Sequence, residues 1–461
     1  MSDEKKADLV SVDNIYRLDG RVPLAKAIPF GLQHVLAMFV SNLVPVLLVC
    51  GVAFVHDQPG GFSSTEIARL LQCAIFCAGI GTTVQLYPIW KIGARLPVVM
   101  GVSFTFVASL MTVASNPDWG YTGMVGAIIV GGLMEGLLGL TAQHWKKHIA
   151  PIVSACVVTT IGFSLLPVGM NSFGGGTGAP DFGAWPHITV GTVTLIACLV
   201  FKQMAKSVWK NLNVLFGLGV GYLLSLILTV TGTATLIDFD ALKTTVSDLG
   251  LVSIPMPIFA TGMMPTFHVG AIVTIGIIFL VSAAETIGDT TAICTGGLGR
   301  DITPREVRGS LTCDGFGSAF AGLFGCCPIT SFSQNVGLVA MTKIVNRFTI
   351  LMGALVLIVA SLFPPIGAFF NSLPNAVLGG CTVMMFGSIV YNGIHMIADC
   401  GFSDRNMIIV ALSFCLGIGA TLVDASIFDA FPPIVGGLFA HSSVAGVFVV
   451  AMVLSFVLPK K

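Results

Sequence analysis

The sequence contains few charged residues. Lysine, arginine, aspartate and glutamate together make up 10% of its 461 residues, whereas soluble domains carry about 25%. Hydrophobic residues make up 55%, and the mean hydropathy is +0.93. This composition excludes a soluble globular protein and predicts a polytopic protein embedded in a lipid bilayer. The formal net charge of zero also argues against nucleic acid as a partner.

Sequence motifs of common enzymes are missing as well. The chain has no Gly-Lys-Ser/Thr phosphate-binding loop and no Gly-x-Ser-x-Gly nucleophile turn. Its 12 cysteines lie mainly in apolar segments, where a thiol behaves as a small hydrophobic group, and no Cys/His spacing matches a zinc site. We therefore expect a protein that is not an enzyme and that binds no cofactor or metal. Residues 1–27 lack an apolar core and are expected to form a cytosolic tail rather than a signal peptide.

Long apolar windows fill most of the remaining chain. Taking about 20 residues per crossing as a guide, we assign fourteen transmembrane segments, so that both termini lie on the same side. Of the 22 basic residues, only Lys243 and Arg69 then fall on the opposite side. The positive-inside rule places the basic side, and with it both termini, in the cytoplasm of a multi-pass protein of the cell (inner or plasma) membrane.

A polar run interrupts the apolar pattern at residues 330–343. It contains Thr330, Ser331, Ser333, Gln334 and Asn335, and hydrocarbon offers no hydrogen bonds to such side chains. Cys327-Pro328 before the run and Gly337 within it are expected to break a spanning helix. An ordinary loop between two helices is the alternative, but a broken helix with polar side chains at membrane depth is typical of a transporter's substrate site.

The two halves of the chain resemble each other at this break. Val102-Ser103-Phe104-Thr105-Phe106 is similar to Thr330-Ser331-Phe332-Ser333-Gln334, and Ser331 follows Ser103 by 228 residues, about half of the chain. Seven spans per half is an odd number, so the second half would enter the membrane from the opposite side. The sequence thus predicts an inverted repeat with interrupted segments at matching positions, the third and the tenth.

Few acidic residues lie inside apolar segments, where a charge costs several kcal/mol. Glu285 and Asp289 are four residues apart and share one face of the eighth span, and Asp314 opens the ninth. Two buried acids one turn apart favour proton uptake, as a proton-coupled carrier requires. The alternative is a structural pair bonded to neighbouring hydroxyls. His34 in the first span is either a partner of these acids or a structural hydrogen bonder, and Glu135 is interpreted as a helix tie or a snorkelling group.

Taken together, these residues resemble the nucleobase–ascorbate transporter family over nearly the whole chain. The matching motifs are Gln33-His34, Glu285-Thr286-Ile287-Gly288-Asp289 and Asp314-Gly315, followed by the signature Gln334-Asn335-x-Gly337-x-x-x-x-Thr342-[Arg/Lys/Gly], met here by Lys343. The four motifs occur in the right order and spacing, which makes the match specific.

The resemblance implies an all-α fold of 14 transmembrane segments arranged as two inverted 7-span repeats, with short β-strand breaks in spans three and ten. A core domain would comprise residues 28–145 (spans one to four) and 266–365 (spans eight to eleven). A gate domain would comprise 146–237 (spans five to seven) and 372–458 (spans twelve to fourteen). The resemblance also implies a homodimer and proton-coupled uptake by an elevator-like movement.

Carried over by motif, Glu285 and Gln334 would bind a purine base directly, because a carboxylate accepts from ring N–H groups and an amide both donates and accepts. Backbone groups near Phe106 and Ser333 would complete the hydrogen bonding, with the Phe106 ring against the purine face. Asp314 would support proton coupling, Asp289 would orient its neighbours, and His34 and Asn335 would hold the geometry of the site.

Within the family, the chain is most similar to bacterial uric acid and xanthine permeases. Xanthine-selective members tend to have Asn at the positions of Thr105 and Val336 and Gly at that of Lys343. The smaller Thr105 leaves room for the 8-oxo group of uric acid, so uric acid is the expected substrate and xanthine the second. We assign selectivity to Thr105 and to the signature positions Val336, Gly337, Thr342 and Lys343. A xanthine- or other nucleobase-selective permease, or an anion transporter of the same architecture, remains the alternative.

Overall fold

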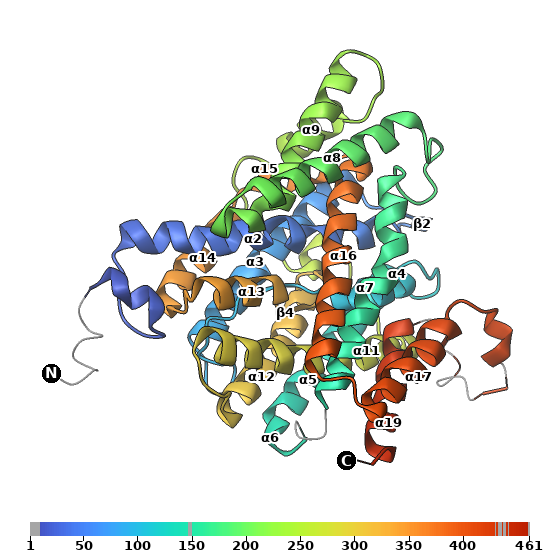
Figure 1. The fold of residues 1–461 in the computed structure, drawn as a ribbon. Helices are drawn as coiled ribbons and strands as arrows, with labels where there is room; N and C mark the ends of the chain where they lie inside the picture. The colour runs from blue at the N-terminus through green and yellow to red at the C-terminus, as the bar shows by residue number, and fades with distance from the viewer. Residues whose placement is uncertain are drawn as a thin grey trace.

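The structure is a computed structural model that describes residues 10–145, 150–428, 430–431, 436, 439–440 and 442–459. In this part of the chain the fold is almost entirely helical (Figure 1). Eight described helices are long and apolar enough to cross a membrane: α2 (Leu24–Cys50), α3 (Ser64–Leu86), α5 (Gly120–Leu140), α7 (Pro151–Phe173), α8 (Trp185–Met204), α9 (Asn213–Val230), α11 (Val269–Ala292, continued by a π-helical turn to Gly297) and α16 (Asn375–Asp399).

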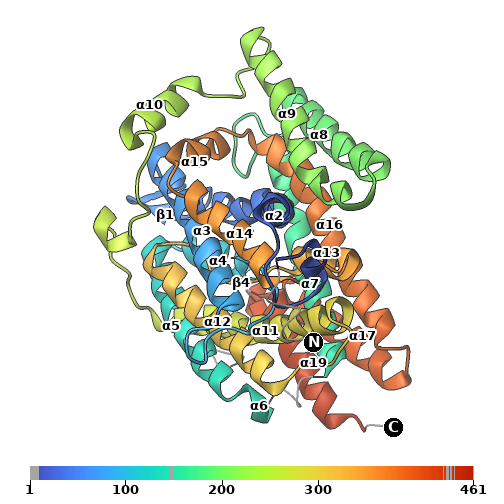
Figure 2. The same ribbon diagram turned by 90° about the vertical axis from the view of Figure 1, so that its left-hand side faces the viewer.

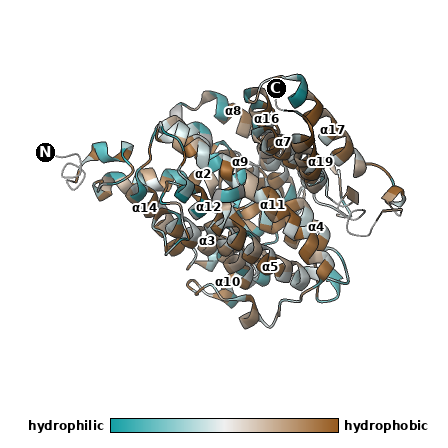
Figure 3. Cartoon of the chain, turned by 90° about the horizontal axis from the view of Figure 1, so that it is seen from below, coloured by the Kyte–Doolittle hydropathy of each residue, from teal (hydrophilic) through white to brown (hydrophobic). Residues whose placement is uncertain are grey.

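Helices that are shorter or, in the case of α12, richer in charged residues occupy the remaining predicted spans. They are η2 and α4 (Phe104–Phe106 and Val107–Ala114), α12 (Pro304–Leu323), α13 (Ser333–Thr342), α14 (Arg347–Ala360), α17 (Asp404–Ala420) and α19 (Ser443–Val457). A bend of 81° separates α14 from α15 (Pro364–Asn371), and the two could together form a further crossing. Hydrophobic residues run along most of the helices, α5 and α11 included (Figure 3). The helical membrane fold is thus confirmed, whereas the number of fourteen spans stays a prediction.

Some predicted features lie outside the described residues. The beginning of the last predicted span, which starts at Ile434, includes residues 434–435, 437–438 and 441, and the N-terminal tail includes residues 1–9. The same holds for the predicted cytoplasmic residues Lys5, Lys6, Lys146, Lys147, Lys460 and Lys461. Outside the predicted spans, the chain also forms α6 (Ala142–Trp145) and the amphipathic α10 (Phe239–Leu249), which packs on α3 and α15.

Small residues bring the helices of the predicted core together. α5 packs against both α11 and α12, and α14 packs against α2 and α3 (Figure 2). A Cβ atom at Gly315 of α12 would lie 2.1 Å from the backbone nitrogen of Gly136 on α5, so only glycine permits this approach. A second group of contacts joins α16 to α7 and α8, and α17 to α19. We propose that these two groups of contacts correspond to the core domain and the gate domain.

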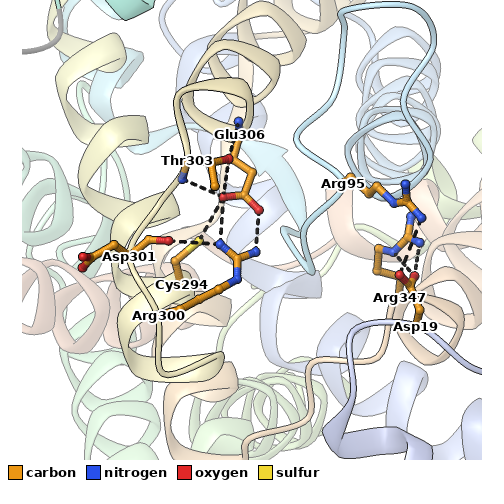
Figure 4. A network of polar contacts seen from close by, with 8 residues as sticks. All are labelled: Asp19, Arg95, Cys294, Arg300, Asp301, Thr303, Glu306 and Arg347. Atoms are coloured by element: carbon orange, nitrogen blue, oxygen red, sulfur yellow. Dashed lines mark hydrogen bonds and ion pairs between the residues drawn. The ribbon is translucent and has the colours of Figure 1, made fainter. Parts of the chain in front are cut away.

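Ion pairs join segments on the side predicted to face the cytoplasm (Figure 4). Asp19 pairs with Arg347 at the start of α14 and, at 3.6 Å, with Arg95. Arg300 binds Glu306 through two hydrogen bonds of 3.0 and 2.5 Å. Glu306 precedes the predicted ninth span and forms a capping box with Thr303. Burial acts to raise the pKa of Glu306, but the bonds from Arg300 and Thr303 outweigh it and lower the pKa below its ordinary value.

Candidate functional site

The two interrupted segments meet as a pair of antiparallel strands. β3 (Met100–Val102) pairs with β4 (Ile329–Ser331), with Gly101 opposite Thr330 in the register. Met100 N also donates to the hydroxyl of Thr82 on α3, at 2.9 Å. Buried backbone groups need such partners, because lipid and packed side chains provide none. The predicted strand breaks at these positions are confirmed.

A helix begins directly after each strand. η2 and α4 start at Phe104, and α13 starts at Ser333. The prediction that Gly337 interrupts the helix is wrong, because α13 runs through it without a break and a Cβ atom there would meet no atom within 4 Å. The interruption is therefore made by Pro328 and β4 alone.

A cavity of about 260 Å³ lies where the two breaks meet. This volume is close to the lower end of the ~300–1,000 Å³ that is usual for small-molecule sites. Residues from both breaks, from α11 and from the facing helices α7 and α16 line it: Val102, Ser103, Phe104, Thr105, Val158, Ile161, Glu285, Gly288, Asp289, Ala292, Thr330, Ser331, Phe332, Ser333, Gln334, Ile389, Asn392 and Met396. Among the predicted binding residues, Glu285, Gln334, Ser333 and Thr105 all contribute to this lining.

Hydroxyl groups from the two breaks converge on the acids of α11. Thr105 donates to one carboxylate oxygen of Glu285, and Ser333 lies 3.3 Å from the other. Asp289 accepts hydrogen bonds from Ser331 (2.9 Å) and Ser333 (2.8 Å). Each repeat thus supplies a hydroxyl to Glu285, which holds its carboxylate at the cavity wall. Among the described residues, Asp289 is hydrogen-bonded to the second break only.

Helix α2 ties both breaks in place. Asn42 accepts from the backbone N–H of Val102 at 2.8 Å, and Ser41 donates to the side-chain oxygen of Gln334 at 3.2 Å. Asn335 donates to the backbone carbonyl of His34 at 3.0 Å. The His34 ring is buried, and neither of its nitrogens has a hydrogen-bond partner among the described residues. His34 therefore contacts the second break through its backbone rather than through its ring.

Asp314 lies behind the cavity rather than in its lining. Its carboxylate accepts from Thr286 (2.5 Å), Gln85 (3.2 Å) and the backbone N–H of Ser331 (3.1 Å). Because Ser331 also binds Asp289, a change of charge at Asp314 would reach the cavity through this strand residue. Both acids are therefore connected to β4.

The structure places four other predicted residues away from the cavity. Phe106 is fully buried against Phe279, with ring centroids 4.6 Å apart, and Phe104 and Phe332 are among the lining residues instead. Val336 packs in an apolar cluster with Ile293.

Two further signature residues lie at the far end of α13. Thr342 bonds to the carbonyl of Leu338 in its own helix. Lys343 ends α13 in a left-handed conformation, with φ 58°, and donates to the carbonyl of Gly296. Direct contact of these four residues with a ligand is therefore not supported.

Several site residues were not predicted from the sequence. Ser41, Asn42 and Gln85 are polar residues in apolar helices, and this was the signal that could have identified them. Asn392 is the polar side chain that α16 adds to the lining. The described residues contain no group of three or more His, Cys, Asp or Glu side chains that could hold a metal ion.

Comparison with known sequences matches this chain to permeases. Residues 25–426 match the sequence profile of the Permease family. The xanthine permease of Bacillus subtilis is 32% identical over 94% of this chain and 93% of that protein. The xanthine permease of Escherichia coli K12 is 32% identical over 97% of this chain and 94% of that protein, and the uric acid transporter of the same strain is 32% identical over 91% and 83%. These relatives are transporters and not enzymes.

Solved structures of transporters share the fold. The membrane domain of a cyanobacterial bicarbonate transporter superimposes with a TM-score of 0.56 at 15% identity, covering 94% of this chain and 98% of that one. A murine solute carrier 26 anion transporter gives 0.59 at 11% identity, covering 94% and 68%. At such low identity the likeness concerns the architecture alone.

Proposed function

The chain belongs to the nucleobase–ascorbate transporter family, and from this premise we propose that it is a proton-coupled purine uptake transporter that prefers uric acid and takes xanthine as a second substrate. The observation that carries the proposal is the cavity between the two breaks, where Glu285, Gln334, Thr105 and Ser333 meet. A flat ring with alternating N–H and C=O groups fits such a set of donors and acceptors.

In this proposal Glu285 accepts from ring N–H groups of the purine, and the Gln334 amide pairs with an edge that both donates and accepts. The ring of Phe104 or Phe332, rather than that of Phe106, lies against the purine face, since these two residues belong to the cavity lining and Phe106 does not. Thr105 and Ser333 orient Glu285 through their hydroxyls. A missing partner at such a buried polar site costs several kcal/mol of discrimination.

The charges around the cavity support coupling to protons. Uric acid is a weak acid that is largely anionic at neutral pH, and the N-terminal ends of the helices that start at Phe104 and Ser333 favour an anion. Glu285 and Asp289 would repel the same anion unless a proton is bound with it. Asp314 is proposed to hold or relay this proton behind the cavity.

The domain movement, the oligomeric state and the membrane orientation are proposed from the resemblance to the family. The core domain would carry the substrate past the gate domain in an elevator-like movement, within a homodimer in the cell membrane and with both termini in the cytoplasm. In this arrangement Val158, Ile161, Ile389, Asn392 and Met396 form the gate side of the cavity, and the two breaks and α11 form the core side.

Substrate choice is proposed to depend chiefly on Thr105. Thr105→Asn should shift preference from uric acid toward xanthine, because the larger amide occupies space needed by the 8-oxo group. Val336→Asn should act indirectly by disturbing the apolar cluster, and Lys343→Gly should relax the left-handed helix end rather than change the lining. An unchanged ratio of uric acid to xanthine uptake in Thr105→Asn would contradict the uric acid assignment.

The function is tested by uptake of labelled uric acid into cells or proteoliposomes, in competition with xanthine, uracil and guanine. We expect competition by xanthine, stronger uptake at lower external pH and loss of accumulation with a protonophore. Sodium dependence with insensitivity to the protonophore would contradict proton coupling. Bicarbonate or sulfate transport without purine transport would favour the anion-transporter alternative.

A further inference from the structure

Glu135 on α5 is a buried acid that the proposed substrate site does not use. It is 1% exposed, and neither carboxylate oxygen has a hydrogen-bond partner among the described residues. The prediction that Glu135 ties helices together or snorkels to the interface is therefore wrong. An ionised carboxylate without a partner at this depth costs several kcal/mol, so its retention calls for an explanation.

The neighbours of Glu135 on α5 define where its side chain points. Gly131, one turn earlier, faces the ring of Phe279 on α11, and Gly139, one turn later, faces Thr312 on α12. On the helical wheel Glu135 falls between these two directions. Its side chain therefore enters the seam between α11 and α12.

Asp314 lies at the same level of this seam. A Cβ atom at Gly315, the residue after Asp314, would lie 2.7 Å from the backbone carbonyl carbon of Glu135. On α11, Ser282 lies one turn after Phe279 and one turn before Thr286, whose hydroxyl binds Asp314. The Ser282 hydroxyl is also buried without a partner among the described residues. Two unpartnered polar groups and Asp314 thus share one seam.

In the described part of the chain, no basic side chain is among the charged groups that act on this acid. The charged groups that act on Glu135 are Asp314 from α12 and Glu285 from α11. α12 also carries Arg305, Glu306 and Arg308 toward its N-terminal end, and α11 also carries Asp289. Of the other elements packed on α5, α4 and β1 (Phe54–Val55) have no ionisable residue, and α6 carries only His144, which is exposed and bonds to the carbonyl of Thr141. The seam can therefore hold two ionised carboxylates only at high cost, and a single shared proton relieves that cost.

We propose that Glu135 is a second proton-binding site that exchanges its proton with Asp314 during transport, an inference that rests on the proposed proton-coupled function. In this step the O–H bond of the Glu135 carboxylic acid breaks and an O–H bond forms on the Asp314 carboxylate, so one proton and one negative charge change places. The hydroxyls of Ser282 and Thr286 are one turn apart on α11, and that of Thr286 donates to Asp314. Asp314 then connects the seam to β4 through the Ser331 N–H.

Glu135→Gln tests the proposal, because glutamine has the shape of the protonated acid but cannot release a proton. Two activities are measured for wild type and variant: purine exchange between equal pools, which needs binding and movement only, and accumulation driven by a proton gradient across pH 5.5 to 8. The control is Asp240→Asn, an exposed carboxylate on α10 outside the seam. Membrane abundance and the melting temperature report folding.

We expect Glu135→Gln to retain exchange and to lose accumulation by about 5- to 150-fold, the range of typical coupling free energies, with a flattened pH profile. Glu135→Asp should restore part of the pH response, and Asp240→Asn should match wild type. A permanently protonated structural acid predicts instead that Glu135→Gln accumulates purine as wild type does, which would overturn the proposal.

A second variant, Ser282→Ala, and the pH response of the wild-type protein complete the experiment. If Glu135→Gln fails to fold, Ser282→Ala takes its place: it should weaken accumulation more than exchange, and equal activities would overturn the proposal. If wild type itself accumulates purine without any pH response, proton coupling is wrong for the whole protein and the role of Glu135 is refuted with it. Wild-type coupling with unchanged Glu135→Gln refutes the role of Glu135 alone.

Discussion

Replacing Glu285 by glutamine is the most direct test of the proposed substrate site. The change keeps the shape of the side chain but exchanges one carboxylate oxygen for an NH2 group and removes the charge. In the structure one oxygen of Glu285 accepts from Thr105 and the other lies 3.3 Å from Ser333. The variant side chain therefore has one acceptor oxygen left, whereas in wild type Thr105, Ser333 and the substrate share two.

The expected loss of binding free energy depends on which hydrogen bonds the variant loses. Ser333 keeps its bond of 2.8 Å to Asp289, so its hydroxyl stays satisfied in the variant. The net loss is then the hydrogen bond between the charged carboxylate and a ring N–H of the substrate, about 1.5–3 kcal/mol. At 1.4 kcal/mol per factor of ten, the dissociation constant should rise by about 10- to 150-fold.

Binding of labelled purine to purified protein measures this change without the complication of transport. Asp289→Asn serves as the matched control, because Asp289 is an acid one turn away on the same helix that bonds to Ser331 and Ser333. We expect the control to weaken binding less than Glu285→Gln. A dissociation constant for Glu285→Gln within about threefold of wild type, less than 1 kcal/mol, would refute direct binding by this carboxylate.

Three other outcomes are expected. Asp314→Asn should abolish or uncouple accumulation while the protein reaches the membrane, and a variant that still concentrates purine against a gradient would clear Asp314 of coupling. Gly315→Ala should cost about 1–3 kcal/mol of stability because its methyl group meets the backbone of Gly136, whereas Gly288→Ala, with no atom within 4 Å, should leave the melting temperature unchanged. Glu306→Gln should lower the free energy of unfolding at neutral pH by about 1 kcal/mol, the usual cost of a lost helix cap, and with it the melting temperature. Since folding lowers the pKa of Glu306, this difference from wild type should vanish as pH falls through that pKa. A difference that stays constant in acid would contradict the assignment.

Much of the site was predictable because hydrocarbon restricts what a chain can place in it. The polar run at residues 330–343 and the acids of α11 stand out against apolar surroundings, and the repeat located the first break as well. The partners of these residues were not predictable. Ser41 contacts Gln334 across 293 residues of sequence, and Gln85 contacts Asp314 across 229. A lone polar residue in an apolar helix reveals that a partner exists but not which one.

The choice between neighbouring residues was also beyond the sequence. Phe104 and Phe106 lie in the same short 3₁₀ turn, where successive residues point about 120° apart. After β3 the side-chain period changes from that of a strand to that of a 3₁₀ helix, and the position of this change determines which ring faces the cavity. A shift of one residue would turn both side chains by about 120° and so change which residue faces the cavity, and sequence patterns locate element boundaries less closely than that.

The structural likeness to anion transporters places the chemical distinction in the lining and not in the fold. A bicarbonate transporter domain shares this architecture at 15% identity, so strand breaks and helix N-termini alone do not imply a purine. In this chain Glu285 and Asp289 line the cavity together with those N-termini, and Asp314 and Glu135 are buried behind it. A cavity that attracts an anion through helix ends and repels it through carboxylates binds that anion best together with a proton. On this argument, removing the two carboxylates at the cavity should not simply inactivate the carrier: it should leave weak anion binding that depends less on pH than in wild type, because Asp314 and Glu135 remain. Binding of uric acid to wild type and to a Glu285→Gln, Asp289→Asn double variant across pH 5.5 to 8 would show whether it does.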